Sequence, residues 1–97
     1  MNLDPFKPDV SLTFATVEKE RVRFVVHCQA LKRDQSEERL SMDIELQEVK
    51  HCDSAGLAFL IEAKKVAQQY GLSVMLHQMP KTACALAEFY GLRAFLE

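Results

Sequence analysis

The sequence of 97 residues has little of what marks several classes of protein. Lysine and arginine never occur in runs of more than two and the net charge is -2, so the concentrated basic surface that nucleic-acid binding needs is missing. Apolar runs such as residues 57–61 are far too short to span a bilayer. Residues 1–8 lack the basic start and the apolar stretch of a signal peptide. We therefore expect a cytoplasmic protein that binds no nucleic acid and reaches a membrane only through a partner.

Cysteine is also sparse, and its spacing does not suit a metal site. Cys28, Cys52 and Cys84 are odd in number and far apart, which fits reduced thiols in a cytosolic protein. The pairs His27-Cys28 and His51-Cys52 could each offer only one ligand to a given site, because neighbouring residues on a strand point to opposite faces. We expect neither a metal nor a cofactor. We also expect no enzyme, since the sequence shows no nucleophile–base pair, no paired carboxylates and no glycine-rich phosphate loop.

The remaining composition, 48% hydrophobic and 27% charged with three glycines and three prolines, is that of one ordinary globular domain over residues 1–97. The expected elements are an extended lead-in at 1–10, strands at 11–17, 21–28, 40–46 and 72–77, and helices from Asp53-Ser54 to Tyr70 and from Pro80 to Tyr90. The first two strands should form a hairpin around a polar turn, whereas the later strand–helix–strand order favours parallel pairing. We therefore predict an α/β fold with a mixed sheet, onto which the apolar residues 92–96 dock.

The junction between a strand and a helix at Asp53-Ser54 carries the functional signal. Both residues are good N-caps, because their side-chain oxygens can accept the unpaired N–H groups of the first helical turn. The same N–H groups and the helix dipole favour an anion there, including a phosphoryl group on Ser54. Gly56 keeps the first turn uncrowded, so that another backbone can approach closely. From the residues alone, a simple cap and an anion or phosphate site both stay open.

Two stretches of the sequence resemble a known family. Residues 49–57, Val-Lys-His-Cys-Asp-Ser-Ala-Gly-Leu, resemble the signature of STAS domains, the family of bacterial anti-anti-sigma factors and sulfate-transporter tails. Residues 53–92, with Gly71 after the helix and Leu-Ala-Glu-Phe-Tyr-Gly-Leu at 86–92, are similar without a gap to the MlaB group of this family. The first 30 residues match only in pattern.

This resemblance implies a non-enzymatic adaptor that binds and regulates the ATPase subunit of a phospholipid-transporting ABC complex, which maintains outer-membrane lipid asymmetry. The chain would then be peripheral to the inner membrane through its partner. The partner-binding residues that the resemblance implies are Asp53, Ser54, Ala55, Gly56, Leu57 and Phe59. The alternative is an anti-sigma factor antagonist switched by phosphorylation of Ser54. Phe59 is as well suited to the core as to an interface.

The N-terminal half departs from the family pattern. STAS domains place a helix between the second and third strands, but the predicted connection at residues 29–39 is shorter than the dozen or more residues that a parallel crossover needs. We therefore expect the STAS-like sheet to carry helices after its third and fourth strands, with the first crossover helix shortened or absent. A homodimer, either domain-swapped or simply paired, would be one outcome of so short a connection.

Overall fold

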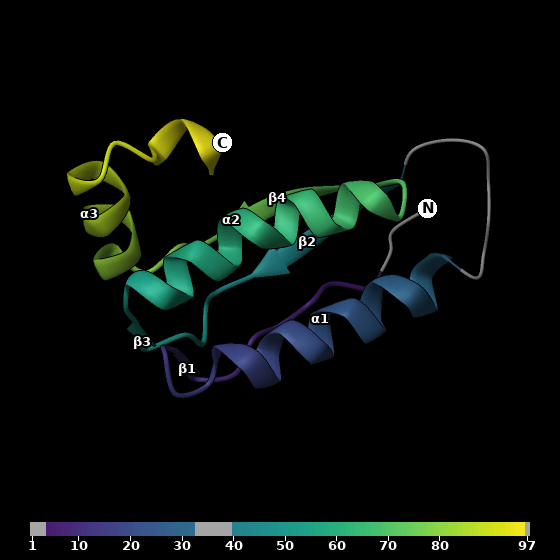
Figure 1. The fold of residues 1–97 in the computed structure, drawn as a ribbon, viewed down its shortest axis with the longest axis horizontal. Helices are drawn as coiled ribbons and strands as arrows, with labels where there is room; N and C mark the ends of the chain where they lie inside the picture. Colours follow the sequence, from purple (N-terminus) through teal and green to yellow (C-terminus); the bar gives the residue numbers. More distant parts are fainter. Residues whose placement is uncertain (1–3, 33–39, 97) are drawn as a thin grey trace.

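The computed structural model describes residues 4–32 and 40–96 (Figure 1). Its elements, in chain order, are β1 (Ser11–Leu12), α1 (Val17–Lys32), β2 (Leu40–Glu45), β3 (His51–Cys52), α2 (Ser54–Gln69), β4 (Leu72–His77), α3 (Lys81–Phe89) and the 3-10 helix η1 (Arg93–Phe95). The predicted α/β class, the later strands and the two later helices are confirmed. No helix within the described ranges is long and apolar enough to cross a membrane.

The strands that the structure describes pair only in parallel. β2 and β4 run in register from Leu40 beside Leu72 to Glu45 beside His77, and β1 pairs with β3. Phe6 forms a further parallel bridge to Ile44. The N-terminal segment therefore lies along one side of β2 and β3, while β4 lies along the other side of β2. The predicted mixed sheet is wrong, because no antiparallel hairpin is present in the described residues.

The predicted strand at 21–28 is wrong, since these residues belong to α1. Glu20, Phe24 and Cys28 are buried at a spacing of four, which is a helical face, whereas Val22 and Val26 are each 57% exposed. Arg21 and Arg23 pair with acidic side chains three residues earlier, a spacing that stabilises helices. Val22, Phe24 and Val26 alternate as in a strand, but in the helix the two valines lie on the exposed side and Phe24 lies on the buried side.

The expectation of a shortened or absent crossover helix is wrong for the same reason. α1 has 16 residues and connects β1 to β2, so the crossover is supplied by residues that we assigned to a strand. Residues 33–39 of the supposedly short connection lie outside the described residues. Because α1 supplies a full crossover, the connection no longer calls for a domain-swapped dimer.

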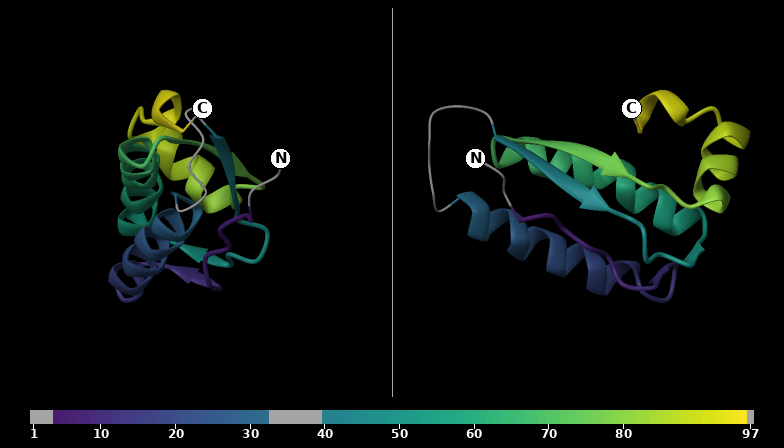
Figure 2. Two further views of the ribbon diagram at one scale, coloured as in Figure 1. Left: turned by 90° about the vertical axis from the view of Figure 1, so that its right-hand side faces the viewer. Right: turned by 180° about the vertical axis from the view of Figure 1, so that it is seen from behind.

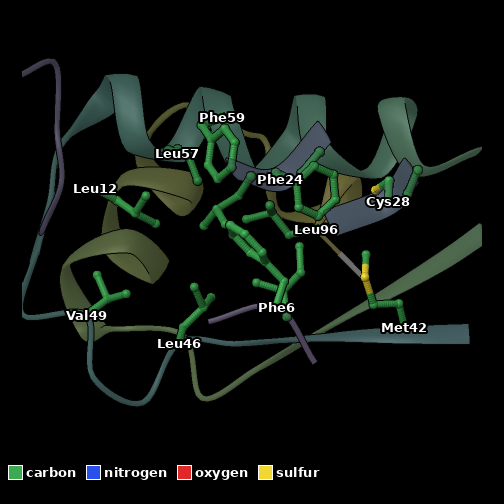
Figure 3. Close-up of a cluster of buried hydrophobic side chains, with 14 of the residues drawn as sticks. Phe6, Leu12, Phe24, Cys28, Met42, Leu46, Val49, Leu57, Phe59 and Leu96 are labelled. Atoms are coloured by element: carbon green, nitrogen blue, oxygen red, sulfur yellow. The ribbon is translucent and has the colours of Figure 1, made fainter. Parts of the chain in front are cut away.

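The core lies between the strands and the two long helices. Figure 2 shows α1 and α2 side by side on one side of the strands, and an ion pair of 3.1 Å joins Arg21 to Glu62 across them. The rings of Phe6, Phe24 and Phe59 stack edge to face through the centre, with successive centroids 5.0 and 6.0 Å apart (Figure 3). The buried face of β2 consists of the even-numbered residues that its alternation predicted. Leu96 is buried against this core, which confirms the docking of the C-terminal tail.

Candidate functional site: the start of helix α2

Asp53 joins three elements where β3 passes into α2. Its backbone is extended, and its Oδ1 accepts the N–H of Gly56 at 3.1 Å, so the residue is the N-cap of α2. Its Oδ2 accepts the N–H of Phe14 from the loop between β1 and α1 at 3.0 Å. Its own N–H donates to the carbonyl of Leu12 at 3.2 Å. The predicted cap is confirmed, and the same carboxylate also fastens a loop that is 39 residues away in sequence.

These hydrogen bonds keep Asp53 charged. The N–H of Phe14, and after it the N–H of Gly56, lower the pKa of the carboxyl below its usual value, while partial burial opposes them. Hydrogen bonds to a carboxylate favour its ionised form. At neutral pH the start of α2 therefore carries a fixed negative charge in front of Ser54.

Gly56 is buried where α2 passes closest to β1. A Cβ at this position would lie 2.0 Å from the carbonyl oxygen of Leu12 and 2.9 Å from Sγ of Cys52. The backbone that approaches Gly56 therefore belongs to the same chain. Glycine at this position is a requirement of helix–strand packing, and its face toward β1 is not open to a partner.

The remaining predicted site residues divide between the core and the surface. Leu57 and Phe59 are 1% and 2% exposed, and the ring of Phe59 packs on Phe24. Of the two alternatives for Phe59, the structure therefore has the core position. Ala55 is half-buried, and Ser54 is exposed as the first residue of α2. The motif thus presents its serine outward and its large apolar side chains inward.

An open groove of about 420 Å³ begins at Ser54 and follows the outer side of α2. Its lining residues come from one side of α2, spaced three or four apart, and from the turn after α3: Ser54, Leu57, Ala58, Ile61, Glu62, Lys65, Tyr90 and Leu92. The floor is apolar, and its rim carries a hydroxyl and charges of both signs. Figure 1 shows that α3 lies at the end of the molecule where α2 begins, which brings Tyr90 to this groove. Such a surface suits contact with another protein.

Two aromatic residues of this region were not predicted as surface residues. Phe14 is 85% exposed, although it lies in the predicted strand at 11–17, and Tyr90, at the end of the predicted helix from Pro80, is 52% exposed. A local signal for Phe14 did exist. Thr16 is followed by Glu18 and Glu20, and a hydroxyl residue before acidic residues is typical of a helix start, which would have made Phe14 part of a loop.

The cysteines and histidines do not converge. Within residues 4–32 and 40–96, no three side chains of the histidine, cysteine, aspartate or glutamate type are grouped as metal ligands. Burial raises the pKa values of Cys28 and Cys52 to about 11, which makes both poor ligands and poor nucleophiles at neutral pH. Nε2 of His27 lies at hydrogen-bond distance, 2.9 Å, from the carbonyl oxygen of Asp4.

Comparison with known proteins agrees with this geometry. Residues 21–97, well over half of the chain, match the model of the MlaB STAS domain family. No curated protein and no solved structure gives a significant match. The matched region contains β2, β3, α2, the site at its start and everything that follows, together with most of α1. The chain therefore belongs to the MlaB family of STAS domains.

Proposed function

We propose that this chain is a non-enzymatic adaptor that binds and regulates the ATPase subunit of a phospholipid-transporting ABC complex. The observation that carries the proposal is the exposed Ser54 at the start of α2, at the head of an apolar groove with a polar rim. Membership of the MlaB family supports a transporter as the context. The complex would hold the chain at the cytoplasmic side of the inner membrane and would act in maintaining outer-membrane lipid asymmetry.

The proposed contact uses the outward side of α2. Ser54 and Ala58 are exposed one helical turn apart, and Ile61 continues the same side beneath the polar groups of the rim. An interface of this kind gains affinity when a small number of apolar side chains enter a desolvated centre that polar groups surround. A serine in such a centre fits closely against its partner, whereas a long charged side chain at that position would hold the two surfaces apart.

Binding measurements with the purified ATPase subunit test the proposal. Ser54→Ala should bind about as well as the wild type, because the hydroxyl removed is solvent-exposed, whereas Ser54→Arg should abolish capture. Ser41→Arg is the matched control, because Ser41 is an exposed serine on β2, away from α2. The proposal is wrong if the wild-type chain does not bind the ATPase, or if both arginine variants bind equally well.

The exposure of Ser54 also permits the alternative function, an anti-sigma factor antagonist that a kinase switches. Its chemistry is less favourable here. A phosphoryl group would bring almost two negative charges close to the Asp53 carboxylate, which already occupies the N–H of Gly56 that a phosphate could otherwise accept. Incubation with a serine kinase of the anti-sigma type, followed by mass spectrometry, separates the two functions. Phosphate on Ser54 would support the antagonist.

A further inference from the structure

Phe14 has the most exposed large apolar side chain in the described part of the chain, at 85%. Its loop is nevertheless closed by hydrogen bonds. The N–H of Thr13 donates to Oγ1 of Thr16 at 3.0 Å, and the N–H groups of Thr16 and Val17 donate to the carbonyl of Thr13 at 2.9 and 2.8 Å. The hydroxyl of Thr16 donates to the carbonyl of Ser11 at 2.8 Å. The fold therefore holds this ring outward on an ordered turn.

The backbone of Phe14 is also fixed relative to the start of α2. The N–H of Phe14 donates to Oδ2 of Asp53, and the other oxygen of that carboxylate caps α2 through Gly56. Ser54 is the next residue after Asp53 and is exposed. The exposed residues Phe14 and Ser54 therefore flank one carboxylate, on a surface at the start of α2 that is built from different elements.

We propose that Phe14 is the apolar anchor of this surface, and that the partner offers it an apolar socket with a basic rim. This inference rests on the proposed function and adds to it the chemistry of the ATPase surface. Rigid aromatic side chains dominate interfaces because they bury much area and lose little conformational freedom on binding. The closed turn fixes the backbone that carries Phe14, so binding has only the two side-chain torsions of the ring left to order.

The basic rim follows from the carboxylate beside Phe14. The carboxylate of Asp53 lies at 3.0 Å from its N–H and stays ionised. Glu18, in the first turn of the helix that follows the loop, is paired with Arg21, so the Asp53 carboxylate is the charge on which the basic rim rests. An approaching carboxylate would be repelled here, whereas arginine or lysine around the socket would complement the surface.

The test is titration calorimetry of the full chain against the purified ATPase subunit. Phe14→Ala should weaken binding by about thirtyfold, the equivalent of a ~2 kcal/mol hot spot at 1.4 kcal/mol per tenfold. Phe14→Leu, which keeps an apolar side chain, should lose less. Val26→Ala is the control, because Val26 is 57% exposed on α1 and should leave Kd unchanged. Binding by the wild type should also weaken as the salt concentration rises.

The outcomes separate the two proposals. Because the side chain of Phe14 is 85% exposed and its hydrogen bond to Asp53 is made by the backbone N–H, Phe14→Ala should melt at the wild-type temperature. Wild-type affinity in Phe14→Ala overturns the anchor and leaves the adaptor function standing. An equal loss in Val26→Ala, or a lower melting temperature of Phe14→Ala, overturns the anchor as well. Affinity that is insensitive to salt overturns the basic rim. Failure of the wild type to bind the ATPase overturns the proposed function itself.

Discussion

Replacement of Gly56 by alanine tests whether the close approach of α2 to β1 holds the site together. The new Cβ would lie 2.0 Å from the carbonyl oxygen of Leu12 and 2.8 Å from its carbonyl carbon, and backbone atoms cannot rotate away as a side chain can. The φ angle of Gly56 is not positive, so alanine meets no conformational penalty there. On helix propensity alone, alanine would stabilise α2 by about 1 kcal/mol. The clash with Leu12 therefore destabilises the protein only if it costs more than the roughly 1 kcal/mol gained in helix propensity.

The size of the clash follows from what must move to relieve it. If α2 shifts away from β1, the hydrogen bonds from Asp53 to Leu12 and from Phe14 to Asp53, now 3.2 and 3.0 Å, are stretched. Each contributes about 1 kcal/mol net, and overpacking a filled site costs a further ~1–3 kcal/mol. After subtraction of the propensity gain of about 1 kcal/mol, the free energy of unfolding should fall by roughly 2–4 kcal/mol.

Urea denaturation measures this loss as a lower midpoint at an unchanged slope. Ala58→Gly is the calibrating control, because Ala58 is exposed on α2 and the change alters propensity alone, by about 1 kcal/mol in the destabilising direction. A Gly56→Ala protein that is as stable as the wild type, or more stable, would refute the reasoning, because propensity would then outweigh the contact with Leu12.

Three further changes probe the core, the cap and the thiols. Phe59→Ala should lower the free energy of unfolding by about 3–5 kcal/mol in urea, because the ring is 2% exposed and leaves a cavity. Backbone hydrogen bonds, first that from Phe14, lower the pKa of Asp53 in the folded state. The Asp53 carboxylate therefore contributes its full stabilisation above the ordinary aspartate pKa of about 3.9. That stabilisation is lost as the pH falls from this value through the lower pKa of the folded state. The acid decline of the urea midpoint should therefore be shallower in Asp53→Asn, and an unchanged decline would contradict this. At about pH 8, a thiol reagent should label exposed Cys84 quickly but Cys28 and Cys52 only after unfolding. Burial raises the pKa values of Cys28 and Cys52 to about 11, which leaves little reactive thiolate in the folded protein. Rapid labelling of all three cysteines would contradict the burial.

The parts of the fold that the sequence predicted correctly are those with one consistent period. Residues 40–46 alternate strictly, and the structure buries Met42, Ile44 and Leu46 while the intervening side chains lie toward solvent. α2 has buried residues at helical spacing, and Asp53 marks its first turn by a cap that depends only on local chemistry. Local rules suffice where the buried face is apolar and uninterrupted.

α1 could not be recognised by the same rules because a charged residue lies on its buried face. Glu20 is completely buried and pairs with Arg23, so the repeat of Glu20, Phe24 and Cys28 does not look apolar in the sequence. The valines that do look apolar, Val22 and Val26, lie on the exposed side. Their β-branched side chains also favour a strand, and tertiary contacts override that preference.

The sequence predicted the helix cap in the candidate site but not the contact that the site makes with a distant loop. The spacing of Asp53 and Gly56 indicates a capped helix, but the hydrogen bond from Phe14 to Asp53 joins residues 39 apart. No local pattern encodes such a contact, because it depends on the parallel pairing that brings β1 beside β3. Because residues 11–17 were predicted as a strand, the loop that exposes Phe14 was not expected.

The helical repeat of α2 places the residues that stabilise the fold and the residues proposed to bind the partner on different sides of the helix. Gly56 and Phe59 point toward β1 and the core, whereas Ser54 and Ala58, one turn apart, face outward. Substitutions on the inward side should therefore lower stability and reduce binding only through unfolding. Substitutions on the outward side should change binding at constant stability. Asp53 serves both sides, since its carboxylate caps the helix and also holds the loop of the proposed anchor, so its replacement should lower both quantities together.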